Sequence, residues 1–199
     1  MKRWVREVTA LICVLLLCIT VSSCSRKPLD VVKAYQHAYN SHDLGQLLPL
    51  IAEEATFQVP GHFDLKGKND IRLVAEYDFA LNIQMTLDRL TARGDTVYCE
   101  LVETNDWLEA AGIDEAYYKG KFVIGKGLIR HIRGEATRET QKAFQDVLNP
   151  LLEWASEERP EQLAQMMQEG KFVYNAENAK KSLALLKEWR EVTEPGSDE

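Results

Sequence analysis

The stretch NIQMTLDRLTARGDTVYCELVETNDW, residues 82–107, decides the fold because it has the pattern of two long strands around a turn. Apolar and polar side chains alternate on both sides of the turn, which is typical of strands with one buried face. We place the turn at residues 93–95, since Gly94 supplies the positive φ angle that a tight hairpin needs. A three-residue loop then pairs Ala92 with Thr96 and predicts an antiparallel hairpin.

This register decides which side chains share the buried face of the hairpin, because the side-chain period of a strand is two residues. The shared face starts with six apolar residues: Ile83, Met85, Leu87, Val97, Cys99 and Leu101. It continues with Glu103 and Asn105 and returns to an apolar residue at Trp107. A carboxylate and an amide are unusual on an apolar strand face, so we predict that they belong to a pocket.

A second hairpin is predicted from residues 115–125 and 128–134, joined by a two-residue turn at 126–127. Its register places Tyr118 and His131 on the same face. We expect that face to line the pocket as well.

Helical patterns precede the hairpins. The first helix has Asp30 as its expected N-cap and carries Tyr35 and Tyr39 in its apolar stripe. A later helix, about 69–81, places Asp78 on its apolar side. Between them we expect a short helix over about 44–53, a strand over 55–60 and a loop over 61–67.

The segment after the second hairpin is predicted to be helical again. Pro150 is expected to kink the first of these helices, and Asn175 to cap the last. Residues 191–199 are acidic and are predicted to be disordered. The expected helices cover about 136–157, about 160–168 and the residues from Asn175 to about 190.

The order of these elements over residues 29–134 resembles the nuclear transport factor 2-like superfamily, which includes the SnoaL-like polyketide cyclases. The residues that carry the resemblance are Tyr35, Tyr39, Asn40, Ser41, His42, Asp43 and Leu44, then Ala55-Thr56-Phe57, Gly67, Ile71, Val97 and Gly127-Leu128-Ile129. The resemblance implies an α+β fold in which a curved antiparallel sheet wraps around three N-terminal helices and leaves a conical cavity. The helical extension, 135–190, lies outside that core.

The N-terminus has the pattern of an export signal. A basic head precedes an apolar run over 8–21, which as a helix spans about 21 Å and is shorter than a hydrocarbon core of about 30 Å. The run ends in Val21-Ser22-Ser23-Cys24, which resembles the lipobox of bacterial lipoproteins. The resemblance implies a signal peptide over 1–23, acyl chains such as palmitate on Cys24, and a tether over 24–28. An ordinary secretory cleavage site is the alternative.

We therefore expect a protein of the cell envelope, anchored by lipid on the extracytoplasmic side of a membrane. Residues 1–23 hold three basic residues and Glu7, so removing them changes the net charge from −7 to −9. Such a charge argues against nucleic acid as a partner. Cys99 is expected to be a buried, inert thiol, and a Cys24–Cys99 disulfide is the alternative if Cys24 carries no lipid.

The candidate pocket residues are Glu103, Asn105, His131, Tyr118, Tyr35, Tyr39 and Asp78. Burial raises the pKa of a carboxyl group, so Glu103 is the candidate general base. The alternatives are an ion pair of Glu103 with Arg89 or Arg133, a turn hydrogen bond for Asn105, and a purely structural role for His131.

The first functional hypothesis is a membrane-anchored lipoprotein that binds a small, largely apolar ligand. The second is a cofactor-free isomerase, hydrolase or lyase that uses Glu103 as base. The third is an envelope interaction or structural module, with a homodimer or tail helices that plug the cavity as versions of it. No metal site or cofactor is expected, because ligand spacings, phosphate loops and dinucleotide motifs are missing from the sequence.

Overall fold

The computed structural model describes residues 26–193. The predicted signal peptide, the predicted lipidation site Cys24 and residues 194–199 lie outside the described residues. Within 26–193, no helix combines the length and the apolar character needed to cross a bilayer.

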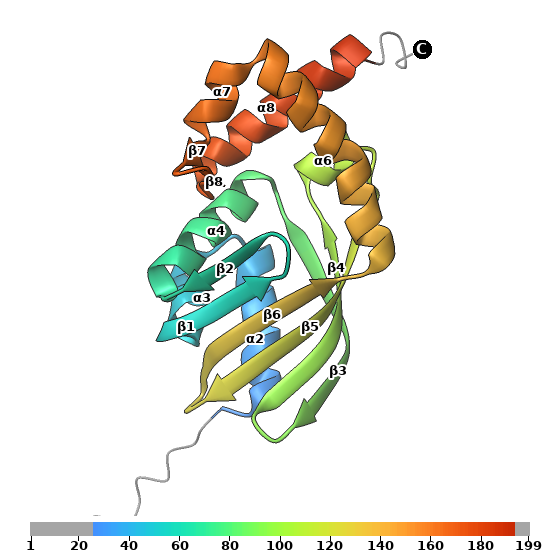
Figure 1. The fold of residues 1–199 in the computed structure, drawn as a ribbon. Coiled ribbons are helices and arrows are strands. Elements are labelled where there is room, and N and C mark those ends of the chain that lie inside the picture. Colours follow the sequence, from blue (N-terminus) through green and yellow to red (C-terminus); the bar gives the residue numbers. More distant parts are fainter. Residues whose placement is uncertain (1–25, 194–199) are drawn as a thin grey trace, which may run out of the picture.

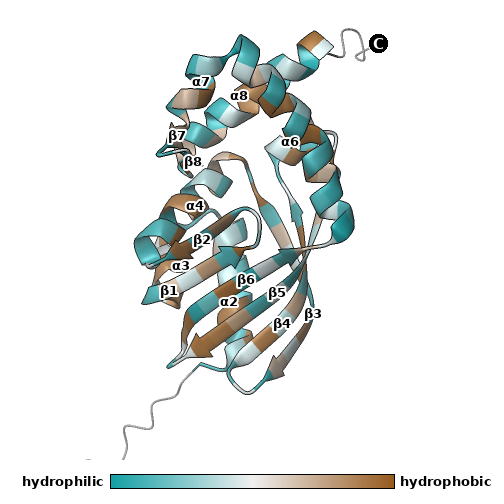
Figure 2. Cartoon of the chain, viewed as in Figure 1, coloured by the Kyte–Doolittle hydropathy of each residue, from teal (hydrophilic) through white to brown (hydrophobic). Residues whose placement is uncertain are grey.

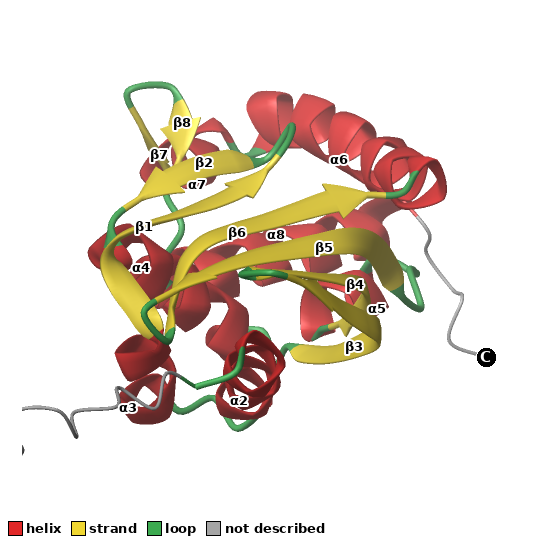
Figure 3. Cartoon of the chain, turned by 90° about the horizontal axis from the view of Figure 1, so that it is seen from below, coloured by secondary structure: helices red, strands yellow, loops and turns green. Residues whose placement is uncertain are grey.

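A six-stranded sheet forms the centre of the molecule, with the strand order β2-β1-β6-β5-β4-β3 (Figure 1). Strands β1 and β6 run parallel and the other neighbours antiparallel, so the prediction of a purely antiparallel sheet is wrong. The two parallel strands lie far apart in the sequence, and the chain between them makes the long connection that parallel pairing requires. The sheet curves around α2 (Figure 3). The elements up to the end of the sheet are α2 (Pro28–Asn40), α3 (Leu44–Leu47), the 3-10 turn η1 (Leu48–Leu50), β1 (Ile51–Val59), β2 (Phe63–Lys66), α4 (Lys68–Ala80), β3 (Gln84–Arg93), β4 (Thr96–Thr104), α5 (Asp106–Ala110), β5 (Ala116–Gly125) and β6 (Leu128–Ala136).

Three expectations for the N-terminal elements are corrected. Helix α2 has Lys27 at its N-cap without a side-chain cap, and Asp30 instead lies in the first turn, where its charge complements the helix dipole. The helix expected over 44–53 ends early, because Pro49 lies in a 3-10 turn and β1 starts at Ile51. The expected loop over 61–67 contains β2, which pairs with β1.

The first hairpin has the predicted buried face but a different turn. Arg93 pairs with Thr96, so the loop has two residues and not three. A bulge near Arg89, whose φ is 52°, adds one residue to β3. Beyond the bulge Leu87 pairs with Leu101, as predicted, because the extra residue restores the register.

The second hairpin has the predicted two-residue turn, with Gly125 paired to Leu128. A bulge then inserts Arg130 into β6, and His131 pairs with Val123. This extra residue turns all later side chains of β6 to the opposite face from the one predicted.

The C-terminal segment, residues 138–193, stands above one end of the sheet (Figure 1). Its first helix contains Pro150, and its last begins after Asn175, whose Oδ1 accepts a 2.8 Å hydrogen bond from the Asn178 amide, as expected for an N-cap. The last helix continues to Thr193, so the start of the predicted disordered tail is helical. The small hairpin before it was not predicted. The elements are α6 (Arg138–Glu158), α7 (Pro160–Gln165), β7 (Met167–Gln168), β8 (Lys171–Phe172) and α8 (Ala176–Thr193).

The buried side chains form two clusters. The sheet cluster packs α2 against the concave face of the sheet, and its fully enclosed members include Val31, Leu47 and Ile129. The upper cluster packs α5 against the C-terminal segment and includes Trp107 and Leu186. Helices α6 and α8 accordingly carry both hydrophobic and hydrophilic residues along their length (Figure 2).

Candidate functional site

A cavity of about 390 Å³ lies where the two clusters meet. Its lining comes from α2, α4, the sheet and the C-terminal segment, and most of it is apolar. Pockets for small molecules are typically concave, apolar and of a few hundred Å³, with a few polar groups. The space between these elements therefore has the size and lining of a ligand site.

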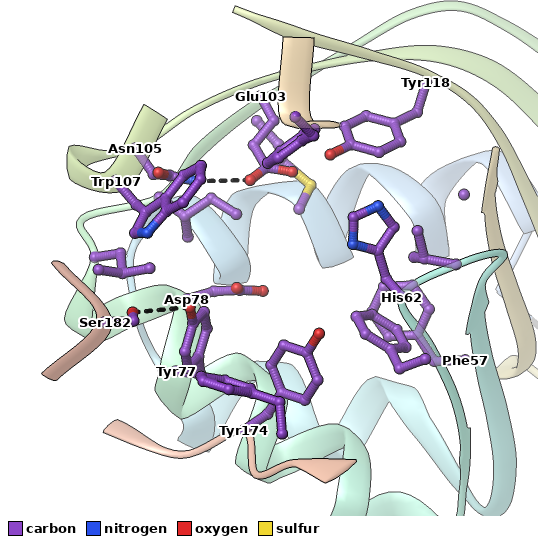
Figure 4. Close-up of a pocket in the computed structure, with 18 of the residues that line it drawn as sticks. Phe57, His62, Tyr77, Asp78, Glu103, Asn105, Trp107, Tyr118, Tyr174 and Ser182 are labelled. Atoms are coloured by element: carbon purple, nitrogen blue, oxygen red, sulfur yellow. Dashed lines mark hydrogen bonds between the residues drawn. The ribbon is translucent and has the colours of Figure 1, made fainter. Parts of the chain in front are cut away.

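Two carboxyl groups, Asp78 and Glu103, point into this cavity from opposite elements (Figure 4). Asp78 lies on α4, three and four residues after the buried Ala75 and Val74, so the apolar face of the helix carries it inward. Glu103 lies on β4, two residues after Leu101 on the concave face. The local periodicity of each element thus positions its carboxyl group.

Each carboxyl group has one hydrogen-bond donor. The Tyr39 hydroxyl donates to Asp78 Oδ2, and Asn105 Nδ2 donates to Glu103 Oε1 at 2.8 Å. Both side chains keep some accessible surface, and both line the cavity. None of the ion pairs within 26–193 involves Asp78 or Glu103, so the predicted alternative of a Glu103 pair with Arg89 or Arg133 is wrong.

Burial changes the protonation of both groups. It raises the pKa of Asp78 to about 7, against the opposing effect of the Tyr39 hydrogen bond. Burial, together with the charge of Asp78, raises the pKa of Glu103 to about 8, against the opposing effect of Asn105. Two carboxyl groups that titrate near neutral pH in one cavity can bind a polar ligand group or transfer a proton.

Asn105 lines the cavity and also makes the turn hydrogen bond that was its predicted alternative. Its Oδ1 accepts a 2.8 Å hydrogen bond from the Leu108 amide and caps α5, while its Nδ2 contacts Glu103. Trp107 lines the cavity from the first turn of α5. The prediction that it lies on a strand is wrong.

The tyrosines form much of the remaining polar lining. Tyr35 and Tyr39 are each 2% exposed, and their ring centroids lie 5.3 Å apart at the base of the cavity. Burial raises the pKa of both hydroxyl groups, and the charge of Asp78 adds to this effect. Tyr118 also lines the cavity, as placed by the register of β4 and β5.

His131 does not line the cavity, and the prediction that it shares the face of Tyr118 is wrong. The bulge at Arg130 turns it to the convex face, where its Nδ1 lies 2.7 Å from the Thr56 hydroxyl. Burial, Lys121 and Arg133 lower its pKa. Its hydrogen bond joins β6 to β1, which is a structural role.

The sequence did not reveal the contribution of the C-terminal segment. Eleven of its residues line the cavity: Phe144, Leu148, Leu151, Leu152, Leu163, Met166, Met167, Phe172, Tyr174, Ser182 and Leu185. The segment forms a wall around an open space and does not fill it, so the predicted plug is wrong. Tyr77 of α4 contacts this wall through a 3.2 Å hydrogen bond between its hydroxyl and Ser182 Oγ. The apolar periodicity of the tail was visible in the sequence, but its partner was not.

The remaining candidates are the cysteine Cys99, the loop histidine His62 and any cluster of metal ligands. Cys99 is a buried free thiol whose pKa burial raises to about 11, as predicted for an inert cysteine. His62 lines the cavity from the turn between β1 and β2, and burial lowers its pKa. Across residues 26–193, no three His, Cys, Asp or Glu side chains are grouped so that they could hold a metal ion.

One protein-family profile matches part of the chain. Residues 32–117 match the sequence profile described as the SnoaL-like domain. No curated protein sequence matches the chain significantly.

Solved structures agree at the level of the fold. An LEH-like epoxide hydrolase of Mycobacterium tuberculosis is 15% identical with a TM-score of 0.51, over 63% of this chain and 94% of that one. The epoxide hydrolase/cyclase-like enzyme SalBIII is 16% identical with a TM-score of 0.52, over 59% and 96%. IdmH of Streptomyces antibioticus, a proposed polyketide cyclase, is 21% identical with a TM-score of 0.51, over 61% and 100%. Residues 32–117 thus resemble the SnoaL-like domain, and the chain shares its mixed α+β fold with these solved proteins.

Proposed function

We propose that the protein binds a small, largely apolar molecule in this cavity and holds one polar group of the ligand against Asp78 and Glu103. The observation that carries the proposal is a mostly apolar cavity of about 390 Å³ with two inward-facing carboxyl groups. Apolar walls supply affinity, and a few polar groups fix the orientation of a ligand. The fold is compatible with this role, since two of its structural relatives are described as epoxide hydrolase-type enzymes.

A calorimetric titration with 2-naphthalenemethanol, a neutral apolar alcohol, tests the proposal. The protein would be produced from Ser25 onward, a stretch that holds both hydrophobic clusters and every described element. We expect saturable binding to one site. Leu148→Trp should fill part of the cavity and weaken binding about tenfold, since lost cavity space removes apolar contacts.

The matched control places the same new side chain on the other face of β4. Thr104 is exposed and does not line the cavity, so Thr104→Trp should leave binding unchanged. Absence of saturable binding, or equal affinity in all three proteins, would overturn the proposal.

A second candidate function is acid–base catalysis without a cofactor: an isomerase, hydrolase or lyase with Glu103 as base. The specific support is the pKa of about 8 for Glu103 beside a second carboxyl group with a pKa of about 7, since catalytic groups work best near the operating pH. In this scheme Glu103 in its ionised form removes a proton from carbon or water, and the protonated Glu103 then returns a proton to the product or to solvent.

Hydrogen exchange on an apolar ketone is a direct test of the base. With 2-tetralone in D₂O, Glu103 would take a proton from the carbon beside the carbonyl and solvent would return a deuteron. We expect protein-dependent deuterium incorporation that falls about 100-fold in Glu103→Gln. Exchange at the same rate in the variant would exclude Glu103 as the base.

The membrane anchor is a separate part of the proposal. The basic head, the apolar run over 8–21 and the sequence Val21-Ser22-Ser23-Cys24 support acylation of Cys24 and an extracytoplasmic, membrane-anchored location in the cell envelope. Metabolic labelling with an alkyne analogue of palmitate should label the full chain and Cys99→Ala but not Cys24→Ala. An unlabelled, cleaved wild-type chain would favour ordinary secretion.

The interaction or structural module, including a homodimer, stays a separate proposal. Its support is the exposed convex face, where Tyr98 and Tyr117 are 43% and 45% exposed. Light scattering after size-exclusion chromatography tests it, and a monomer at all concentrations would count against the homodimer.

A further inference from the structure

We propose that the ligand of this cavity is an organic cation, a protonated primary amine on an apolar body, whose ammonium group binds between Asp78 and Glu103. The inference rests on the cavity binding proposed above and names the chemical class of the ligand.

The first argument is the balance of charge in the cavity. Asp78 and Glu103 line it, and neither forms an ion pair within residues 26–193. Arg133 borders the cavity, but it alternates with Ile132 and Gly134, and its Nη2 lies 3.9 Å from Glu135 on the convex face. Buried carboxylates are costly without a positive partner. A cationic ligand supplies that partner.

The second argument is the lining around the two carboxyl groups. Aromatic rings from several elements line the cavity, among them Phe57, Phe63, Tyr77, Trp107, Tyr118 and Tyr174. Several pack edge-to-face against each other, such as Tyr77 and Tyr174 at 5.2 Å and Phe63 and Tyr174 at 5.3 Å between centroids. Aromatic faces attract organic cations, most strongly where water is excluded. The same rings also pack well against an apolar ligand body.

The third argument is the set of free acceptors. Within the described residues, Asp78 Oδ1, Glu103 Oε2 and the Tyr118 hydroxyl have no hydrogen-bond partner. Tyr118 is half-buried, and its hydroxyl points into the cavity near Glu103 (Figure 4). A primary ammonium group has three N–H donors. Three free acceptor oxygens in one cavity therefore suit it.

The other titratable groups of the lining do not supply a competing charge. Burial lowers the pKa of His62, which favours its neutral form. Burial raises the pKa of the cavity tyrosines Tyr35, Tyr39, Tyr77, Tyr118 and Tyr174, so they also stay neutral. Without ligand, the two carboxyl groups titrate at about 7 and about 8. An ammonium group favours their ionised forms, so its binding should release protons.

Calorimetry with a matched pair of probes tests the inference. The titrations would compare 2-naphthylmethylamine with 2-naphthalenemethanol at pH 8, in phosphate and in Tris, whose heats of ionisation differ. We expect the amine to bind about tenfold more tightly than the alcohol and to release protons, because charge-assisted hydrogen bonds are the stronger ones. The alcohol should bind without proton release.

Conservative variants locate the effect. Glu103→Gln and Asp78→Asn keep an oxygen that can accept from Asn105 and Tyr39 respectively, so both should fold. Each should weaken amine binding about tenfold and weaken alcohol binding by a smaller factor, because a neutral hydroxyl loses only an uncharged hydrogen bond. Glu100→Gln removes an exposed carboxyl group from the opposite face of the same strand and should change neither affinity.

The outcomes separate the two proposals. An alcohol that binds as tightly as the amine, with no proton release by the amine, would overturn the cationic ligand and leave cavity binding in place. Unchanged amine affinity in both carboxyl variants would also overturn it. If neither probe binds, cavity binding itself fails.

Discussion

The cavity has two walls that differ in chemistry and in origin. The acid wall consists of Tyr39, Asp78, Glu103, Asn105 and Tyr118, which lie within the stretch that matches the SnoaL-like profile or, in the case of Tyr118, directly after it. The roof comes from the C-terminal segment, 138–193, and contributes mostly leucine, methionine and phenylalanine side chains. Tyr174 and Ser182 are the polar exceptions in the roof.

The two walls differ in what their side chains can do. The acid wall contains the groups that can bind or transfer a proton, whereas the roof covers the cavity with mostly apolar side chains. Burial is the main cause of the raised pKa values of Asp78 and Glu103, so the roof, which helps to bury them, also raises the pKa values of the acid wall. The roof lies outside residues 32–117, so this tuning depends on a segment beyond the matched domain.

The largest expected effect is on the stability of the roof. Leu186 is fully buried in the upper cluster, and Leu186→Ala should lower the free energy of unfolding by about 2–5 kcal/mol. Leu47→Ala, at an equally buried site in the sheet cluster, is the matched variant. Urea unfolding followed by circular dichroism measures both. A loss below about 1 kcal/mol for Leu186→Ala would contradict tight packing of the roof.

The acid wall should make stability depend on pH. Asp78 and Glu103 have raised pKa values in the folded protein, so their contribution is fully present below their ordinary values and is lost as pH rises through about 7 and 8. We expect wild-type stability to fall between pH 5 and pH 9 by the order of a few kcal/mol.

Urea unfolding of the double variant Asp78→Asn, Glu103→Gln measures how much of this fall belongs to the pair. Its stability should change much less over the same range. An equally steep fall in the double variant would assign the pH dependence to other groups.

An asparagine caps a helix beside each wall of the cavity, so the same substitution can be compared at the two positions. Asn105→Ala removes the cap of α5 and Asn175→Ala that of α8, so each should cost about 1 kcal/mol in thermal unfolding. Only Asn105→Ala should also raise the pKa of Glu103 further, because it removes a hydrogen bond that lowers it. NMR titration of the Glu103 carboxyl in each variant measures this pKa. Equal pKa values in the two variants would show that the Asn105 hydrogen bond does not affect Glu103.

The smallest expected effect lies at the surface of the roof. Leu152 lines the cavity but is 45% exposed, so Leu152→Gln should change stability by no more than about 0.5 kcal/mol. It should weaken binding of the neutral alcohol less than Leu148→Trp does. A large loss of stability in a thermal melt would show that Leu152 is a packing residue.

Much of the acid wall was predictable from local periodicity. The alternation of β4 placed Glu103 two residues after Leu101, and the helical pattern of α4 placed Asp78 with Val74 and Ala75. Neither placement required knowledge of the partner element. The proximity of the two carboxyl groups followed only from the resemblance to a known fold.

Registers were predictable only up to the next bulge. In the first hairpin the bulge at Arg89 compensated for a shorter turn, so the predicted face was right. In the second, the bulge at Arg130 had no compensation, and His131 turned away from the cavity. A bulge responds to the curvature of the whole sheet, and short-range alternation carries little information about it.

The sequence by itself determined the amphipathic elements, the turns at Gly94 and Gly127, the buried thiol Cys99 and the side of each element that carries the acidic groups. Only the tertiary structure decided that the C-terminal segment roofs the cavity, that β1 and β6 pair in parallel and that two carboxyl groups share one cavity. The physical reason is the distance along the chain over which each property is determined. Side-chain periodicity is set by the few neighbouring residues of a helix or strand, whereas burial and the pKa shifts it causes depend on segments far away in the chain.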